Sequence, residues 1–318
     1  MVDQILEMLD KGGAQEQPHG AHRSLIDHLR GTMKVLCHWR QPESVIAAGL
    51  LHSVYSTEAY RHTLISISDR AKVAAVAGEE GERLAYLFCT IRRNHLFKVL
   101  AQMETADWES VVIGRNRSAE YQEISRREVG ALLVLHMANQ AEQSEPKDCW
   151  LSQVSQWGAW AHPLVQQVPP VFHGCSEQVT ADKEKFGLEC YGAGVREFKN
   201  FPDSKMQNIL ASAKTLPWVA EPLVFLAYEA LLGGRWLDAF AFATSALALF
   251  DEWGTAWDKR LAFADWKSAS AYIKHWSEHG FTEPTTTTRL VRESVAAGAE
   301  SWIQTFRRLA GELCQARS

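Results

Sequence analysis

The chain contains 318 residues, of which 46% are hydrophobic and 22% are charged, and its formal net charge is −5. This length predicts about two domains of ordinary size, and the hydrophobic content is sufficient for buried cores. The negative net charge and the lack of a dense run of lysine and arginine argue against nucleic acid or an anionic membrane surface as the main partner.

The sequence also lacks signals for export or membrane insertion. Its N-terminus is polar and no stretch of about 18 apolar residues occurs, so neither a signal peptide nor a membrane span is predicted. The six cysteines are scattered without a Cys-x-x-Cys motif, which is typical of reduced thiols and offers no zinc pattern. We therefore expect a cytoplasmic protein. Because no segment shows convincing strand alternation, the predicted fold class is all-α.

Helical periodicity marks the first part of the chain. Apolar spacing predicts a short helix over residues 2–9 and a longer one over residues 24–39. The next helix begins near Pro42, a residue suited to a first helical turn, and ends near His52. The residues one turn before His52 are small enough for a neighbouring helix to approach closely, so His52 is expected to point inward.

Two histidines and a serine form the first candidate site. His22 lies one helical turn before Ile26, on the apolar stripe of the longer helix. His28 falls about 240° around that helix from His22 and is therefore expected to face elsewhere. Neighbouring residues on a helix are about 100° apart, so His52 and Ser53 are both expected to reach one centre near the end of their helix.

The segment 48–53, Ala-Gly-Leu-Leu-His-Ser, resembles the Ala-Ala-Leu-Leu-His-Asp core of the HD superfamily. That superfamily comprises helical, metal-dependent phosphohydrolases and some di-iron oxygenases. His22 and His52 match the first and second histidines of its pattern, and Ser53 stands where the family has aspartate. Asn139 stands at the place of the distant family aspartate. The resemblance implies a helical pocket with His22 and His52 as catalytic or metal-binding residues, in which both family carboxylates are replaced by neutral groups.

Residues that follow the central histidine extend this candidate site. The polar stretch from Tyr55 to Glu58 is expected at the pocket mouth, with Tyr55, Ser53 and Asn139 as ligand-binding groups. In the HD subgroup that hydrolyses guanosine tetraphosphate, an acidic pair just past the His-Asp motif is catalytic. This resemblance makes Glu58 a candidate catalytic residue, and the alternative is a solvated loop acid. The adjacent Arg92 and Arg93 could hold phosphate, with Arg92 as the candidate ligand, although two adjacent arginines at a helix end usually serve the helix dipole instead.

Two further histidines are candidate metal ligands. A predicted helix over residues 82–93 continues its apolar side to His95, and a helix over residues 125–143 carries His136 on the same face as Asn139. Together with His22 and His52, they would form a nitrogen-rich site for a divalent transition metal, namely iron, zinc or manganese. The alternative is that His95 caps a helix and His136 fills a gap in the core.

The organisation of the chain is predicted in three parts. Residues 1–145 form a divergent HD-like helical domain, residues 146–205 an irregular linker with short helices, and residues 206–318 a helical-repeat-like domain. Within the last part, residues 221–250 resemble one tetratricopeptide repeat, because small residues stand where two antiparallel helices would pack closely. A final amphipathic helix is expected between residues 290 and 309.

The polar and aromatic cluster Trp257–Arg260 follows the repeat-like segment. It is expected either at an interdomain contact or at the edge of a binding groove.

Two functions of different classes follow from these features. The first is a divergent HD-superfamily hydrolase or oxygenase that acts on a small, phosphorylated or oxidisable substrate in a histidine-lined, metal-containing pocket. The second is a non-catalytic ligand-binding or protein-interaction protein with a degenerate HD pocket, whose C-terminal half binds a protein partner. Retention of both histidines favours the enzyme, whereas the replaced carboxylates favour the binding protein.

Overall fold

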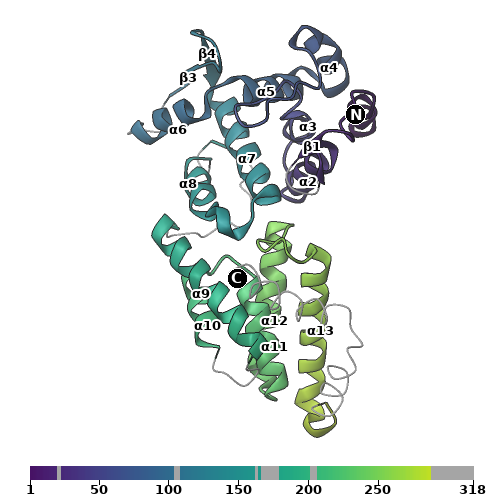
Figure 1. Cartoon of the computed structure of the whole chain (residues 1–318), viewed down its shortest axis with the longest axis vertical. Coiled ribbons are helices and arrows are strands. Elements are labelled where there is room, and N and C mark those ends of the chain that lie inside the picture. Colours follow the sequence, from purple (N-terminus) through teal and green to yellow (C-terminus); the bar gives the residue numbers. More distant parts are fainter. Residues whose placement is uncertain (20–22, 104–107, 162–163, 166–178, 201–205, 288–318) are drawn as a thin grey trace. The chain divides into compact units, whose positions relative to one another are not determined.

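The computed structural model describes six segments of the chain: residues 1–19, 23–103, 108–161, 164–165, 179–200 and 206–287. These segments are predominantly helical, which confirms the predicted all-α class, although two small two-stranded sheets are also present (Figure 1). The chain divides into two compact units. Unit 1 contains residues 1–143 and 154–175, and unit 2 contains residues 144–153 and 176–318. The predicted amphipathic helix between 290 and 309 lies outside the described residues.

The described part of unit 1 is built mainly from seven α-helices, and its connections include the 3-10 turn η1 (Ile67–Asp69) and a β-hairpin between α6 and α7. The helices are α1 (Val2–Lys11), α2 (Leu25–His38), α3 (Glu43–Leu51), α4 (Arg70–Ala77), α5 (Glu79–Thr90), α6 (Arg93–Gln102) and α7 (Arg126–Gln143). The helix α8 (Leu151–Ala161) follows a second 3-10 turn, η2 (Pro146–Asp148).

The start of α2 is fixed by its own sequence. The Ser24 side chain accepts from the Asp27 backbone N–H, and the Asp27 carboxylate accepts from the Ser24 backbone N–H, which forms a capping box. Just before it, the short strand β2 (Arg23–Ser24) pairs antiparallel with β1 (Pro18–His19). This pairing holds His19 beside the first turns of α2.

Helix α3 lies at the centre of unit 1 and packs against α2, α5 and α7. Six of its nine residues are buried, so it has no polar face to turn to solvent. Gly49 permits the closest approach, because a Cβ atom there would lie 2.5 Å from Leu36 Cδ1 of α2. The small residues before His52 therefore allow the close helix contact that the sequence predicts.

Residues 110–125 contain a β-hairpin, although the sequence shows no convincing strand alternation. Strand β3 (Ser110–Gly114) pairs antiparallel with β4 (Tyr121–Ser125), with Ser110 opposite Ser125 and Gly114 opposite Tyr121. Within β3 the pattern of burial alternates, and Val111 and Ile113 are buried while Val112 is exposed. Three adjacent apolar residues hide this alternation in the sequence, because the sequence does not show which of them faces the core.

The same hairpin ends the predicted helix over residues 82–93 early. Helix α5 stops at Thr90, because Ile91 is extended and pairs with Arg115 beside the hairpin. The chain restarts as α6 at Arg93, so His95 lies on a new helix with a different direction.

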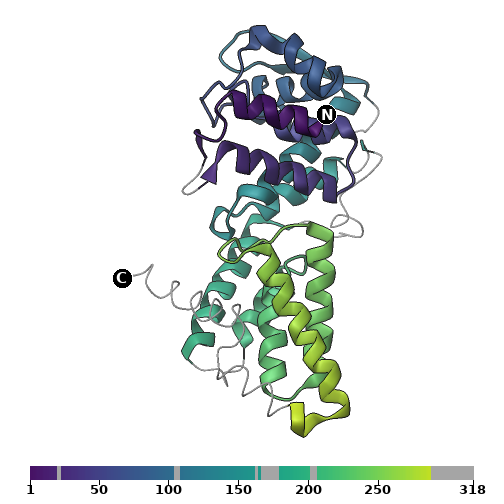
Figure 2. The same cartoon turned by 90° about the vertical axis from the view of Figure 1, so that its right-hand side faces the viewer.

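The described part of unit 2 contains five further helices, and each packs against the next one along the chain (Figure 2). They are α9 (Ala181–Asn200), α10 (Gln207–Thr215), α11 (Glu221–Leu232), α12 (Trp236–Trp253) and α13 (Phe263–Thr282). Helices α11 and α12 pack together as a helical hairpin, in the segment whose small residues predict one. The described part of residues 146–205 is not an irregular linker with short helices, since α9 alone is 20 residues long.

Glycines in α9 explain that difference. In sequence, Gly187 and Gly194 indicate irregular structure, because glycine weakens a helix. In the structure, a Cβ at Gly187 would lie 2.6 Å from Leu216, and one at Gly194 would lie 2.5 Å from Ile209. These glycines therefore allow α9 to pack closely against α10 and Leu216, and they do not interrupt α9.

The cluster Trp257–Arg260 is part of the core of unit 2. Asp258 is fully buried, and its carboxylate accepts from Tyr191 Oη at 2.8 Å and from Arg260 Nε at 2.8 Å. The backbone carbonyl of Asp258 accepts from Trp266 Nε1 at 2.9 Å. This network joins α9 and α13 through the loop before α13, which a sequence alone does not reveal.

Glu221, the first residue of α11, is buried beside this network. Its Oε1 atom accepts the backbone N–H groups of Trp257 at 2.6 Å and Asp258 at 3.0 Å. Burial raises the pKa of Glu221 to about 7, and the negative charge of Asp258 adds to this effect. A carboxyl whose folded pKa exceeds its unfolded value opposes folding once it ionises.

We expect Glu221→Gln to remove a pH dependence of stability. In the wild type, this group lowers the free energy of unfolding as pH rises from the unfolded pKa of 4.5 to the folded value of about 7. The loss amounts to about 3 kcal/mol, at about 1.4 kcal/mol per pKa unit. Glutamine keeps the acceptor oxygen and carries no charge. Urea unfolding at about pH 5 and about pH 8 measures the difference.

The exposed Glu278→Gln substitution is the matched control for this experiment. It should leave the pH dependence of the wild type unchanged. A Glu221→Gln variant that loses as much stability as the wild type between the two pH values would show that Glu221 does not cause the dependence.

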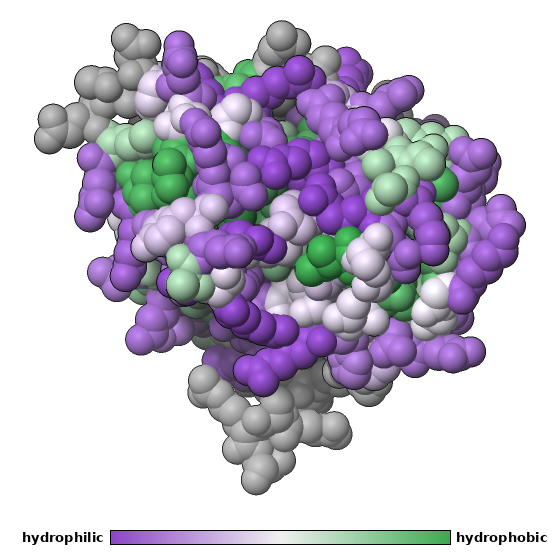
Figure 3. Space-filling model, turned by 90° about the horizontal axis from the view of Figure 1, so that it is seen from above, coloured by the Kyte–Doolittle hydropathy of each residue, from purple (hydrophilic) through white to green (hydrophobic). Residues whose placement is uncertain are grey.

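None of the helices in the described segments is long and apolar enough to cross a membrane. The four cysteines within these segments are free thiols. The face drawn in Figure 3 carries mainly hydrophilic side chains, with apolar residues in separate patches.

Candidate functional site

A small cavity of about 50 Å³ lies inside unit 1. Its walls come from β1, α2, the end of α3, the loop after α3, α5, α6 and α7. Three imidazole rings belong to these walls, those of His19, His28 and His52. Segments that are distant in the sequence therefore bring a histidine cluster to one place.

His28 and His52 face each other directly. His28 lies on α2 and His52 is the C-terminal cap of α3, and both side chains are almost fully buried. Their Nε2 atoms are 3.0 Å apart. His28, which was expected to face elsewhere, is thus the nearest partner of the central histidine.

The second ring nitrogen of each histidine is held by an acceptor. His28 Nδ1 lies 2.5 Å from Oε2 of Glu142 on α7, and His52 Nδ1 lies 2.8 Å from the carbonyl oxygen of Gly49. Arg23 also binds Glu142, at 2.7 Å. Gly31 provides space for this carboxylate, because a Cβ atom there would lie 2.3 Å from Glu142 Oε1.

The acceptors determine which nitrogen of each ring donates to them. A carbonyl only accepts, so His52 Nδ1 carries the proton. Burial and the neighbouring His28 lower the pKa of His52 to about 3, so its Nε2 presents a lone pair. Burial opposes ionisation of Glu142, but hydrogen bonds from His28 and Arg23 outweigh it and lower the pKa of this carboxyl. The Glu142 carboxylate therefore accepts from His28 Nδ1.

This arrangement directs two imidazole Nε2 atoms at one another across 3.0 Å. If each ring carried a proton only at Nδ1, two Nε2 lone pairs would face each other at this distance and repel. A cation between or beside them removes the repulsion, either as one shared proton or as a metal ion.

His19 covers the ring of His28. The two rings stack with centroids 4.1 Å apart and an interplanar angle of 9°. His19 Nε2 lies 3.3 Å from Oε1 of Gln143, while its Nδ1 is buried without a partner in the described chain. Burial, followed by the charge of His28, lowers the pKa of His19.

Ser53 and Asn139 lie with His52 at the cavity wall, where the resemblance to the HD pattern placed them. Both side chains are buried. Neither side chain has a hydrogen bond to another described residue. The sequence thus identified three residues that the fold does bring together. His22, the first histidine of the predicted pattern, lies outside the described residues.

Two other predicted site residues serve the structure instead. Tyr55 is buried, and its hydroxyl donates to Glu82 Oε1 at 3.0 Å, so it does not line the cavity. Arg92 donates to the carbonyl oxygens of Arg115 and Ser118, at 2.8 and 2.7 Å. Arg92 thereby anchors the β3–β4 hairpin.

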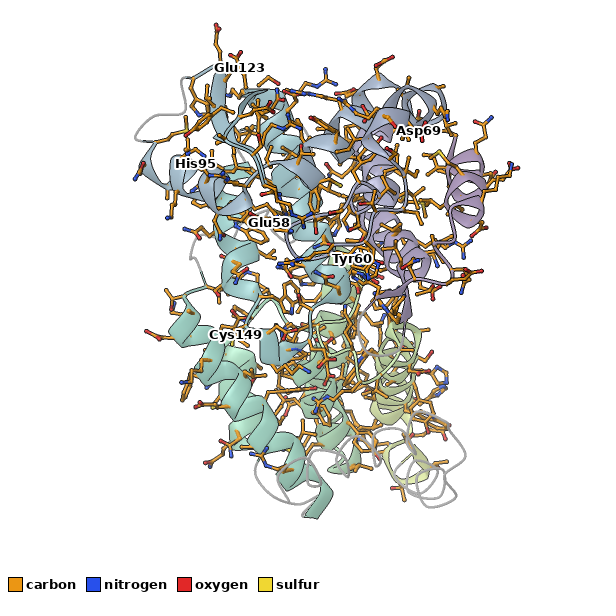
Figure 4. All side chains as sticks on the ribbon, turned by 45° about the horizontal axis from the view of Figure 1, so that its top comes forward. Glu58, Tyr60, Asp69, His95, Glu123 and Cys149 are labelled. Atoms are coloured by element: carbon orange, nitrogen blue, oxygen red, sulfur yellow. The ribbon has the colours of Figure 1, made fainter. Side chains whose placement is uncertain are left out.

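The remaining predicted residues also lie off the cavity wall. Glu58 is exposed on the loop after α3. His95 Nδ1 accepts from the Gly114 N–H at 2.9 Å, and Figure 4 shows His95 on α6, away from Tyr60 of the cavity. His136 is buried among aromatic rings, with Phe88 at 4.3 Å between centroids. Neither His95 nor His136 lines the cavity, although the rings of His136 and His52 both contact Phe88.

Sequence reasoning missed His28 and Glu142, although a signal for His28 was present. Measured from His22, His28 falls off the stripe, but His28, Thr32 and Val35 follow each other by four and three residues. All three are buried on α2, so they mark an inward face. Glu142 has no comparable local signal. It places a carboxylate beside His28.

Residues 8–93 match a family that is described as a domain of unknown function (DUF6817). The match includes His28 and His52 and ends before α7, which carries Asn139 and Glu142. No curated protein and no solved structure matches the chain.

Proposed function

We propose that unit 1 is a metal-dependent enzyme of HD type that acts on a small substrate, with His28 and His52 as its metal ligands. The observation that carries this proposal is the opposed pair of Nε2 atoms, each on a ring whose other nitrogen is held by an acceptor. Metal-binding histidines usually have this second contact, to a carboxylate or a backbone carbonyl.

The separation of the two nitrogens fits a shared ion. Two imidazole nitrogens that each lie about 2 Å from one ion are about 3 Å apart when the angle at the ion is near 90–100°. The observed distance between His28 Nε2 and His52 Nε2 is 3.0 Å. The Glu142 carboxylate, which contacts His28, supplies one negative charge close to the ion.

The other donors at the cavity wall leave coordination positions open. No third His, Cys, Asp or Glu completes a ligand group within the described segments. Ser53 and Asn139 offer neutral oxygen atoms, and catalytic sites keep positions for water or substrate. A bound ion would polarise a substrate oxygen or lower the pKa of a bound water. The nitrogen-rich set suits zinc, iron or manganese, of which zinc and iron prefer imidazole most.

With this assignment, the first histidine of the HD-like pattern is a different residue. His28 takes the place that the sequence pattern gave to His22, and Glu142 acts through His28 as a positioning residue. The reaction remains either a hydrolysis or an oxidation, the two classes that the resemblance implies.

A metal-free ligand-binding pocket is the second candidate. It is supported by the same 3.0 Å distance, which is also the length of an N–H···N hydrogen bond. In this case, one proton shared by His28 and His52 takes the place of the metal ion. The cavity would then bind its ligand without a metal.

The test is elemental analysis of the full chain, purified without a histidine tag. We expect about one metal ion per chain in the wild type and almost none in His28→Ala and His52→Ala, because each loses one of two ligands. His38→Ala is the matched control, since His38 is exposed on the same helix as His28. Wild-type protein without metal after growth with each of the three metals would favour the metal-free pocket.

A further inference from the structure

Arg93 is a cation at the cavity wall that lacks an anion. It is the first residue of α6, and its guanidinium has no hydrogen bond or salt bridge to another described residue. Its one ring contact is with Phe88, 5.3 Å from the ring centroid. Arg70 and Arg83, which are partly buried as well, have the carboxylates of Glu82 and Glu128 as partners.

The isolation of Arg93 has an energetic cost. Burial lowers the pKa of Arg93, and the charge of Glu58 opposes this effect only in part. Glu58 itself is exposed and forms no salt bridge with Arg93. Partial burial of a charge is unfavourable unless a partner compensates for it. A ligand anion at the cavity would be such a partner.

Tyr60 provides a second unused hydrogen-bonding group at the same wall. A tight loop holds it in place, in which Thr57 N–H donates to the Tyr60 carbonyl at 2.6 Å and Tyr60 N–H donates to Thr57 Oγ1 at 2.9 Å. The Tyr60 hydroxyl is nevertheless buried without a partner among the described residues. The amide of Asn139, also at the wall, is likewise without a described partner.

The cavity size limits what can bind these groups. A volume of about 50 Å³ accommodates on the order of four water-sized groups, because one water needs about 10–15 Å³ on this measure. A carboxylate or a single phosphate group is of this order, and a larger part of a ligand must lie outside. Guanidinium groups bind both kinds of oxyanion with paired, charge-assisted hydrogen bonds.

We infer that this cavity binds an oxyanion head group of the substrate, with Arg93 as its counter-ion and with Tyr60 and Asn139 as supporting hydrogen-bond partners. The inference rests on the proposed function only in naming this group a substrate, because binding of the anion itself needs no metal. Bound in this way, the head group lies beside the His28–His52 pair. The remainder of the substrate extends from the cavity mouth.

The test measures anion binding to the full chain by thermal unfolding, at constant ionic strength and in the presence of a chelator. The probes are acetate, inorganic phosphate and, as a neutral control, acetamide. We expect saturable stabilisation by acetate or phosphate and none by acetamide, because only the anions neutralise Arg93. Which of the two anions binds identifies the head group as a carboxylate or a phosphate.

Three variants assign the binding to Arg93. Arg93→Gln should weaken anion binding about 10- to 100-fold, whereas Arg93→Lys, which keeps the charge without the paired donors, should have an intermediate effect. Arg92→Gln removes the same charge from the adjacent residue, which contacts only the hairpin, and should bind like the wild type. Without ligand, Arg93→Gln should unfold at the same or a higher temperature than the wild type, because it removes an uncompensated charge.

Two results would overturn the inference. One is equal stabilisation of wild type and Arg93→Gln by both anions, and the other is stabilisation by neither anion in the wild type. Because the chelator removes metal, these results do not depend on the proposed metal site. Anion binding without metal content would retain this inference and reject the proposed enzyme centre. Metal content without anion binding would do the reverse.

Discussion

Replacement of Glu142 by glutamine is expected to lower metal binding at the proposed His28–His52 site about 10- to 100-fold, because Glu142 would act through His28. The carboxylate accepts from His28 Nδ1 at 2.5 Å and from Arg23 at 2.7 Å. Glutamine supplies one neutral oxygen in place of two charged ones, so His28 becomes less basic and its ring less well oriented. Competition with a chelator of known affinity measures the change.

The same substitution should also reduce stability. Removing one partner from a buried ion pair costs about 3 kcal/mol or more, because the other charges lose their compensation. Gly31→Ala offers a second variant that leaves the carboxylate itself intact, since its Cβ atom would displace Glu142 Oε1. We expect it to weaken metal binding as well.

Glu128→Gln is the control for Glu142→Gln. Glu128 lies on the same helix and pairs with Arg83 at 2.8 Å, but it does not line the cavity. It should lose some stability and keep the metal affinity of the wild type. If Glu142→Gln binds metal as tightly as Glu128→Gln does, Glu142 does not position His28 for a metal ion.

Asp258→Ala is expected to lower the free energy of unfolding of unit 2 by about 3–5 kcal/mol, the usual cost of breaking a buried ion pair. Asp258 is fully buried and accepts from Tyr191 and from Arg260. Alanine would leave the Tyr191 hydroxyl and the Arg260 guanidinium without their acceptor. Urea unfolding followed by tryptophan fluorescence measures the loss, since Trp266 contacts the same network.

Asp251→Ala provides the contrast for an exposed pair. Asp251 binds Lys267 at 2.6 Å, and both side chains reach solvent, with exposed fractions of 62% and 40%. Such pairs contribute about 0–1 kcal/mol, because solvent screens the charges and the side chains lose entropy. Equal losses in the two variants would show that the Asp258 network contributes no more than a surface ion pair.

The sequence by itself determined the elements that depend on local interactions. The all-α class follows from spacings of three and four residues, which place apolar side chains on one helix face regardless of what that face contacts. The capping box of Ser24 and Asp27 likewise acts within one turn. The small residues before His52 were sufficient to predict a close helix contact and an inward histidine. Ser53 and Asn139 were located from a motif in the same way.

Only the tertiary structure decided which side chains share the cavity. His28 and Glu142 are 114 residues apart in the chain and meet because α2 packs against α7. The β3–β4 hairpin turns the chain at Ile91 and so separates His95 from the site, which no spacing within a helix predicts. The roles of Arg93 and Tyr60 depend on the fold, which leaves the Arg93 guanidinium and the Tyr60 hydroxyl without a hydrogen-bond partner among the described residues. Helix periodicity records which face is buried, whereas the partner on that face is set by packing between distant segments.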